Sequence, residues 1–585
     1  MFNTCSPYLK LLADKGVEWN PSLTEELVER AIKEDKLIFQ HIGYVSNMYI
    51  REASVKLFND PRVIKILNGN FICIAEDKDD KPESFLLALD LLFLNQDFSY
   101  GPMNMFIMPN RKPIICFSDC DIDNFLEITN SIILAKEEKK ELLIKLSEEL
   151  SKRAINTGII TEKGRKTKLD SALLSKYVQL WYKGMFENDF IYKLRPFTPN
   201  PSSLLTVIEY LKYFPNETIS LKMESLLDHL QFSAIFDPID GGFFRQAKDY
   251  SCQEAQYEKT LEENSQFLML YATAYKNFNK ESYRETALMT YQYIKNELSN
   301  TVGGYYSSTT LITPVEDSAY YFYSINELSI LFPERYPDIA IALGMDLTKN
   351  RLIKQTPVRS ADCYEVITED ELNLLRDRRD EHRGYFVDKR EITSYNSQFV
   401  KALAISSKLL DIDKMYQDAI DGLSYLLINN RNNFGKLYRY TCCQQRALLG
   451  YLSDYSNFID ASLELFKAKG DREYFKVAER YLNIVMENFY KPENGMFSKS
   501  EKNLQTETIP FKRESNIDII SPSANSIMAG NLLSFYEITG NKEYLKIAEQ
   551  QINNIVPNLL SSGPMLSSWA HKILKLIKLN TGRSE

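Results

Sequence analysis

Histidine is scarce in this sequence, which has four in 585 residues. That scarcity limits histidine-based proton transfer and histidine-bound metals. The eight cysteines show no structural zinc spacing, and the N-terminus lacks the basic and apolar pattern of an export signal. We therefore expect reduced thiols in a cytoplasmic protein that holds no metal.

Long apolar runs and a basic excess are also missing. No stretch of about 18 apolar residues is present, although a membrane-spanning helix needs one. The net charge is −9, whereas binding to nucleic acid requires a basic face. A glycine-rich phosphate loop, a nucleophile elbow and a His-Glu-x-x-His pattern are absent as well. We therefore expect no membrane, no nucleic acid and no cofactor among the partners.

The first 128 residues alternate apolar runs with helical patterns. Helices are predicted at 27–34, 55–67 and 84–94, and strands at 37–43, 71–75, 103–108 and 114–117. This order predicts a small α/β domain with thioredoxin-like connectivity. A charged helix at 128–154 and a polar linker at 156–168 follow it.

Three stretches of the remaining chain are versions of one unit. In each, an amphipathic helix ends in a polar turn and a tyrosine begins the next helix, at Tyr283, Tyr474 and Tyr544. Between them a glycine–aromatic loop recurs, at 241–244, 303–306, 384–386 and 495–497. Self-similarity over tens of residues predicts stacked helical hairpins, here closed into a ring. We expect a site at the end of the ring where these loops gather.

Short motifs in a fixed order link both parts of the chain. They are Ser-Pro-Tyr-Leu at 6–9, Pro-Met-Asn-Met-Phe at 102–106, Tyr-Glu-Lys at 257–259, Thr-Ser-Tyr-Asn at 393–396 and Pro-Ser-Ala-Asn-Ser at 522–526. With them the chain resembles, over nearly its whole length, the thioredoxin-like family that includes spermatogenesis-associated thioredoxin-like proteins and bacterial YyaL-type proteins. The resemblance implies a multidomain α/β and α fold. It places a thioredoxin-like domain at 1–128, a connecting helix and linker at 129–168, and an (α/α)6 toroid at 169–585, similar to acylglucosamine epimerases and six-hairpin glycosidases.

The chain departs from the family pattern where the chemistry would lie. The family's Cys-x-x-Cys pair is replaced by Asn-Met-Tyr-Ile at 47–50. Thiol–disulfide exchange needs a thiolate and a resolving thiol, so we expect a redox-inactive domain. In the toroid, the family histidine of the Tyr-Glu-Lys motif is Gln256, and its acidic loop has no carboxylate until Glu316. None of His229, His382 and His571 matches a family position, which disfavours epimerisation by paired histidines.

Several polar residues at or beside the family motifs remain as candidates. Glu258, Asp388 and Asp454 are the predicted acid/base residues, because glycoside chemistry needs paired carboxylates. The alternative is structural: these carboxylates would cap helices or join ion pairs. The predicted substrate-binding residues are polar or charged side chains near the same motifs: Arg245, Lys259, Glu263, Asn264, Tyr395, Asn396, Arg513 and Asn525.

Two classes of function fit these residues. In the first, the toroid is an enzyme that acts on a carbohydrate-like or other polar small molecule by carboxylate acid/base chemistry, without thiol redox activity. In the second, the protein is a pseudoenzyme or scaffold that binds a ligand in the toroid or a protein partner at the thioredoxin-like domain. The retained carboxylates favour the first class, and the lost thiols favour the second. Fold analogy alone does not decide between them.

Overall fold

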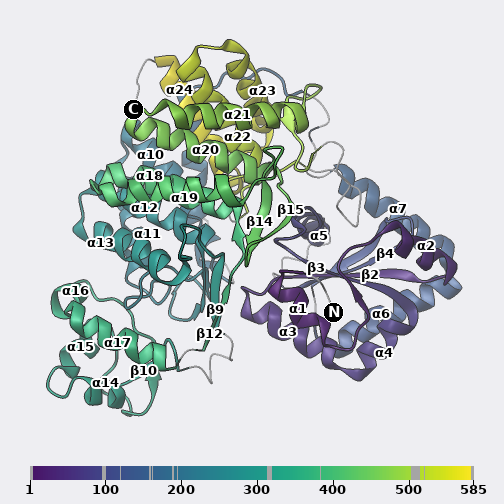
Figure 1. The fold of residues 1–585 in the computed structure, drawn as a ribbon, viewed down its shortest axis with the longest axis horizontal. Helices are drawn as coiled ribbons and strands as arrows, with labels where there is room; N and C mark the ends of the chain where they lie inside the picture. The colour runs from purple at the N-terminus through teal and green to yellow at the C-terminus, as the bar shows by residue number, and fades with distance from the viewer. Residues whose placement is uncertain are drawn as a thin grey trace. The chain divides into compact units, whose positions relative to one another are not determined.

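The computed structural model describes residues 4–94, 101–118, 120–156, 160, 163–187, 190–193, 196–311, 319–382, 384–501, 514–519 and 521–581. The chain forms two compact units (Figure 1). The first comprises Met1–Thr161 and Phe497–Ser515, and the second Glu162–Met496 and Asn516–Glu585. Arg513 and Glu316 lie outside the described residues. Within those ranges, no helix has both the length and the apolar character needed to cross a bilayer.

The first unit is built on a five-stranded sheet in the order β1-β3-β2-β4-β5. β1, β3 and β2 are parallel, and β4 and β5 each run antiparallel to their neighbour. This order and these directions define the thioredoxin-like fold that the sequence predicts. The strands are β1 (Trp19–Asn20), β2 (Leu37–Gly43), β3 (Phe71–Asp77), β4 (Met103–Ile107) and β5 (Pro113–Phe117).

Every residue of β2 and β3 is buried, which explains why both read as continuous runs without alternation. The helices of this unit are α1 (Pro7–Ala13), α2 (Glu25–Lys33), α3 (Met48–Asn59), α4 (Pro61–Asn70), α5 (Pro82–Leu94), α6 (Ile122–Glu138) and α7 (Lys140–Asn156).

Two predicted helices are each interrupted. The prediction of one helix at 55–67 is wrong, because α3 ends before Asp60 and α4 begins at Pro61. The Asp60 carboxylate caps α4 by accepting a hydrogen bond from the Arg62 backbone at 2.8 Å, and proline suits the first position of a helix. The charged helix predicted at 128–154 is likewise two helices, which meet at the non-helical Lys139.

The second unit is a closed ring of helical hairpins. Its inner helices are α10 (Pro201–Tyr213), α12 (Leu261–Phe278), α18 (Thr393–Leu410), α20 (Leu452–Lys469), α22 (Ala524–Thr539) and α24 (Ser567–Thr581). Each packs against the next, and α24 packs against α10, so the ring closes. Each inner helix also contacts at least one outer helix. The outer helices are α11 (Glu217–Gln231), α13 (Glu281–Tyr293), α19 (Asp413–Asn429), α21 (Arg472–Asn488), α23 (Lys542–Leu559) and α8 (Ser171–Tyr182). The predicted (α/α)6 toroid is thus confirmed.

The repeated polar turns join inner to outer helices. Four inner helices end at a residue in the left-handed conformation: Asn279, Asp411, Gly470 and Gly540. Glycine and asparagine adopt this conformation at low energetic cost, which is why they recur in the turns. Because one outer helix separates successive inner helices along the ring, the inner helices run in the same direction.

Short strands follow the outer helices and lead into the inner ones. They include β8 (Glu258–Thr260), β9 (Ser308–Leu311) and β12 (Tyr385–Asp388) in one sheet, and β13 (Glu391–Ile392), β14 (Tyr438–Cys442) and β15 (Gln445–Leu449) in another.

A helical insertion lies between β9 and β12. It contains α14 (Ile325–Leu331), α15 (Tyr336–Ala342), α16 (Cys363–Val366) and α17 (Glu369–Glu381), which project from the ring (Figure 1). These helices share an apolar core that includes Tyr323, Ile339 and Leu375. Arg379 of α17 forms an ion pair with Asp237 at 2.8 Å and ties the insertion to the loops of the ring.

Candidate ligand-binding cavity

Two predicted binding residues fasten the glycine–aromatic loops to inner helices. The Asn264 amide donates to the Phe243 carbonyl at 3.0 Å, and its oxygen accepts from the Phe243 backbone N–H at 2.7 Å. Asn396 makes the same pair with Tyr305, at 2.9 and 2.8 Å. Both side chains also donate back to their own helix, to Thr260 and Ile392. These contacts make the two asparagines structural clamps in successive repeats.

Lys259 lies in a buried ion network. Its ammonium group donates to Asp237 and to the Gly241 carbonyl, both at 2.7 Å. It also lies over the Tyr293 ring, 4.4 Å from the centroid. Burial lowers the pKa of Lys259 against the opposing effect of Asp237. Since this side chain is fully buried, its contacts brace the loop layer.

Four more of the predicted residues make contacts within the same layer: Arg245, Glu258, Glu263 and Asp388. The Arg245 guanidinium lies 2.9 Å from the Glu263 carboxylate, and the backbone carbonyl of Glu258 accepts from the Arg245 N–H at 2.9 Å. Arg390 binds Asp388 at 2.6 Å, two residues away. All five side chains are buried.

Asp454 joins two elements at the start of α20. Its carboxylate accepts from the Ser394 backbone at 3.0 Å, from Arg439 at 2.8 Å and from the Tyr451 backbone at 2.9 Å. Burial raises its pKa despite the Arg439 charge. Tyr395 packs beneath the same guanidinium, 5.8 Å from it.

The buried Asn525 accepts a hydrogen bond from Gln551 at 3.2 Å. None of the ten predicted site residues that the structure describes lines the central cavity, whose walls are given next. Most of them make separate contacts in the loop layer, and their functional roles stay predictions.

A cavity of about 860 Å³ lies at the centre of the ring, between the six inner helices. Most neutral polar side chains of the cavity come from the first turns of these helices, whereas most charged ones come from positions further along them. The neutral end is lined by hydroxyl and amide side chains: Ser202, Ser265, Gln266, Gln398, Asn457 and Ser568. The ring therefore holds one space with two chemically different ends.

Lysine dominates the charged end. Seven lysines and four carboxylates line the cavity, which leaves three positive charges in excess when all are ionised. The lysines are Lys212, Lys401, Lys408, Lys467, Lys572, Lys575 and Lys578, and the acids are Glu209, Asp460, Glu464 and Glu537. Three ion pairs are formed across this group: Lys401–Asp460 at 2.8 Å, Lys467–Glu464 at 2.7 Å and Lys212–Glu209 at 2.5 Å.

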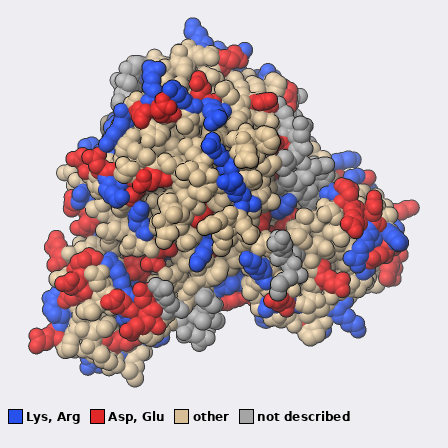
Figure 2. Space-filling model, in the orientation of Figure 1, with Lys and Arg blue, Asp and Glu red and all other residues tan. Residues whose placement is uncertain are grey.

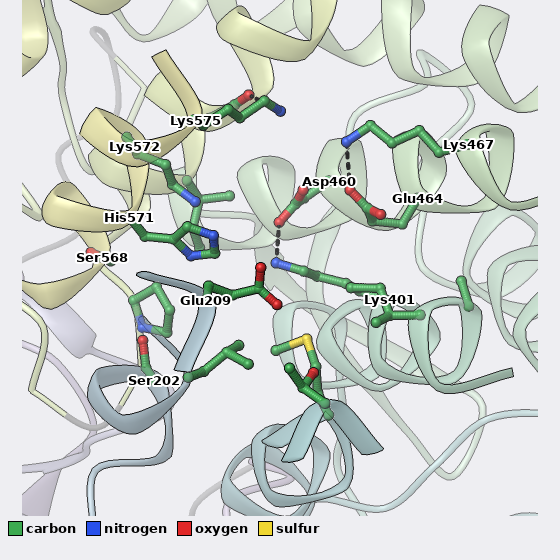
Figure 3. A pocket seen from close by; sticks show the side chains of 18 of the residues that line it. Ser202, Glu209, Lys401, Asp460, Glu464, Lys467, Ser568, His571, Lys572 and Lys575 are labelled. Atoms are coloured by element: carbon green, nitrogen blue, oxygen red, sulfur yellow. Dashed lines mark hydrogen bonds and ion pairs between the residues drawn. The ribbon is translucent and has the colours of Figure 1, made fainter. Parts of the chain in front are cut away.

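The side chains of Glu209, His571, Lys401 and Lys572 point into one space (Figure 3). They come from three inner helices, α10, α18 and α24. Burial and the neighbouring Lys572 hold the pKa of His571 well below its usual value, so its imidazole is neutral at pH 7. A neutral imidazole can accept a proton from a bound molecule.

The lysines differ in their protonation. Burial and the Lys401 charge lower the pKa of Lys572 to about 8, and burial with Lys467 lowers that of Lys575 to about 7. Burial also opposes the charge of Lys401, yet Asp460 raises the pKa of Lys401 overall. One cavity thus contains two kinds of lysine. Some are ammonium groups that carboxylates hold in place, and others have a pKa near 7 to 8.

Sequence reasoning missed this cluster. The signal was present in α24, where Lys572, Lys575 and Lys578 recur every three residues beside the buried Ile573, Leu574 and Leu576. Such a lysine stripe is typical of a solvent-facing helix surface. Only closure of the ring turns the stripe inward, and sequence spacing does not reveal this.

In the first unit, Asn47 and Ile50 begin α3, where the family carries its cysteine pair. The Asn47 side chain caps the helix by accepting from the Ile50 N–H at 3.0 Å. Cys73 is buried in β3, and burial raises the pKa of its thiol. A buried thiol that stays protonated is a poor nucleophile.

The fold and its two units define a class of protein: a thioredoxin-like domain joined to an α/α toroid. Residues 1–154 match the family Thioredox_DsbH, described as "Protein of unknown function, DUF255". Over 93% of its length the chain is 23% identical to mouse spermatogenesis-associated protein 20, covering 76% of that protein, and the human protein is 23% identical over 92% of this chain and 76% of its own. The predicted family resemblance is thus confirmed.

Among solved structures, the chain is similar to a cellobiose 2-epimerase from Spirochaeta thermophila, with a TM-score of 0.44 and 11% identity, covering 72% of this chain and 100% of that one. It is also similar to a GH76 α-mannanase of Bacteroides thetaiotaomicron, with a TM-score of 0.42 and 11% identity, covering 70% of this chain and 96% of that one.

Proposed function

We propose that the toroid cavity binds a carbohydrate-like small molecule that carries an anionic group, and that the protein acts on it by acid/base chemistry without thiol redox activity. The observation that carries this proposal is the excess of lysine in the cavity of a chain whose net charge is −9. On the face that Figure 2 shows, both acidic and basic side chains are present. A cavity whose lining has a net excess of one sign of charge favours ligands of the opposite sign.

The neutral end of the cavity supports a ligand rich in hydroxyl groups. Hydroxyl and amide side chains both donate and accept hydrogen bonds, as a polyol requires. The lysines at the other end favour a carboxylate, phosphate or sulfonate, which they can bind as point charges. The two ends together support a sugar acid or a sugar phosphate as the ligand class, with its anionic group toward the C-terminal ends of the inner helices.

Glu209 and His571 are the acid/base pair that we propose for this cavity. Both line it, and they face the same space (Figure 3). The neutral imidazole of His571 would accept a proton, and the Glu209 carboxyl, held by Lys212 at 2.5 Å, would exchange a second one. In this proposal Glu258, Asp388 and Asp454 support the loops and act only indirectly.

The absence of redox activity rests on residues 47–50. Neither Asn47 nor Ile50 has a thiol, so the start of α3 cannot form the mixed disulfide that exchange requires. Insulin reduction measures this directly. We expect no turnover above a protein-free control, and sustained turnover would refute this part of the proposal.

A second candidate is a pseudoenzyme or scaffold that binds the same ligand class without turnover, or holds a protein partner at the thioredoxin-like unit. The observation that favours it is the pairing of Asp388 with Arg390 and of Asp454 with Arg439. Both carboxylates hold arginines outside the cavity, where they stabilise loops.

Calorimetric titration with glucose 6-phosphate, glucuronate and glucose tests the binding step. We expect the two anions to bind and glucose to bind at least about tenfold more weakly. Lys572→Glu should weaken anion binding by a similar factor. The matched control is Lys476→Glu, since Lys476 is exposed on α21 and should leave binding unchanged. Equal affinity for glucose and both anions would contradict an anion site.

Proton exchange distinguishes an enzyme from a pseudoenzyme. Each ligand that binds is incubated with the protein in D₂O, and deuterium incorporation at carbon is followed by NMR. We expect incorporation or product with the wild type and a loss of at least about 10²-fold in Glu209→Gln, the usual contribution of a general acid or base. Binding without any exchange or product would favour the pseudoenzyme.

A further inference from the structure

Lys575 differs from Lys401 and Lys467 in its partners. Its ammonium group donates to the Ser534 hydroxyl and, at 3.4 Å, to the Gly530 carbonyl. No carboxylate of the described chain lies within ion-pair distance of Lys575. Lys401 and Lys467, in contrast, each hold a carboxylate at 2.8 and 2.7 Å. Without a carboxylate partner, an amine among other cations is easier to deprotonate.

The charged groups around Lys575 come from three helices. Lys572 and Lys578 lie three residues before and after it on α24. Lys467 and Glu464 reach the cavity from α20, and Glu537 from α22. Lys467 and Lys572 disfavour the ammonium form of Lys575, whereas Glu464 and Glu537 favour it.

Burial and the repulsion from Lys467 prevail, and the pKa of Lys575 falls to about 7. At pH 7 about half of these side chains would be neutral, against about one in a few thousand for an ordinary lysine. The neutral amine is the nucleophilic form.

We propose that Lys575 forms a Schiff base with the aldehyde or ketone group of the anionic ligand. This inference rests on the proposed function and deepens it, because it names a carbonyl compound as the ligand and a lysine as the covalent partner. A sugar phosphate or sugar acid presents such a carbonyl in its open-chain form. The lysines nearby would hold its anionic group while Lys575 reaches the carbonyl carbon.

The step needs no further reactant. The lone pair of the neutral amine forms a bond to the carbonyl carbon, and the carbonyl π electrons move to oxygen, which takes up a proton. Loss of water from this carbinolamine then breaks the carbon–oxygen bond and leaves the imine. The Ser534 hydroxyl touches the lysine nitrogen and is placed to relay the proton that the nitrogen releases. Oxidation states do not change.

Lys401 is the internal comparison within the same cavity. It lies among the same helices, but Asp460 binds it at 2.8 Å and raises its pKa. Its ammonium form is retained at pH 7 to 8, so it should not form an imine. Arginine in place of Lys575 keeps the positive charge and removes the nucleophile, which separates covalent reaction from charge.

The experiment uses the full chain, glyceraldehyde 3-phosphate as the carbonyl probe and 3-phosphoglycerate as its non-carbonyl counterpart. Brief incubation with sodium cyanoborohydride converts an imine into a stable adduct, which intact mass and peptide mapping locate. We expect one adduct, on Lys575, that rises with pH around 7. Lys575→Arg should reduce it at least about tenfold, whereas Lys476→Arg, at an exposed lysine outside the cavity, should leave it unchanged. Thermal unfolding checks that both variants fold.

The two proposals fail in different ways. If 3-phosphoglycerate binds in calorimetry but no adduct forms on Lys575, the Schiff-base inference is overturned and the anion site stands. An adduct on Lys572 or Lys401 in place of Lys575 also overturns it. If 3-phosphoglycerate and the sugar anions do not bind at all, the proposed function itself fails.

Discussion

Asn264 exchanges two hydrogen bonds with the backbone of Phe243, one in each direction, at 3.0 and 2.7 Å. Asn396 does the same with Tyr305 one repeat later. Each clamp fixes a glycine–aromatic loop to the inner helix that follows it. The toroid motifs that carry the family resemblance therefore lie largely at the joints of the ring, and most of their residues lie outside the cavity.

Replacement of Asn264 by alanine tests the clamp. Asn264→Ala would leave the buried N–H and C=O of Phe243 without this partner, and each such loss costs about 1–3 kcal/mol. We expect the free energy of unfolding in urea to fall by about 2–4 kcal/mol. Asn488→Ala is the control, because Asn488 donates to the Ile484 carbonyl of its own outer helix and should cost under about 0.5 kcal/mol. Equal losses in both variants would contradict a clamp.

A substitution at Gly242 tests how closely the glycine–aromatic loop packs against Tyr293. The Gly242 φ of +77° is unfavourable for other residues, and a Cβ there would lie 2.6 Å from the Tyr293 ring. Gly470 has a similar φ of +76° with open space around it. We expect Gly470→Ala to cost about 1 kcal/mol, from the backbone alone, and Gly242→Ala clearly more. Thermal unfolding of the two variants measures the difference, and indistinguishable melting temperatures would show that the contact is tolerated.

Asp518 should titrate well above an ordinary aspartate. Burial raises its pKa to about 6, although Ser568 donates hydrogen bonds to it from its backbone at 2.8 Å and its hydroxyl at 2.5 Å. The folded state then binds a proton that the unfolded chain has released, so this group lowers the free energy of unfolding as pH rises from about 4 to 6. The shift of about two pKa units corresponds to about 3 kcal/mol.

The measurement is the ¹³C chemical shift of the Asp518 carboxyl, assigned with Asp518→Asn. We expect a midpoint near pH 6. The variant lacks the titrating group, so its free energy of unfolding should fall less between pH 4 and 6 than that of the wild type. A midpoint near pH 4 and parallel stability profiles would show that the serine hydrogen bonds outweigh burial.

The sequence predicts which residues form helices and strands better than it predicts which helix faces line the cavity. Strand β2 coincides with the predicted residues 37–43, because seven consecutive buried positions leave a strong apolar pattern. The helix predicted at 55–67 fails at Pro61, where the local capping of Asp60 outweighs the apolar period. The sequence alone could not assign the lysine stripe of α24 to a cavity. Polar residues recur at the same spacing whether their helix face points into a cavity or out to solvent. Only contacts between α24 and α10, far apart in sequence, settle which face is enclosed.

The Lys401–Asp460 pair determines which cavity amine stays charged. Asp460→Asn removes the carboxylate that raises the pKa of Lys401, while burial, which lowers that pKa, remains. We expect the pKa of Lys401 to fall below its ordinary value, as measured by competitive acetylation of individual lysines across pH. Glu473→Gln is the control, since it removes the partner of the exposed Lys476, where solvent screens the charge, and should change acetylation there only slightly. An unchanged Lys401 profile in Asp460→Asn would mean that water in the cavity, and not Asp460, stabilises its ammonium form.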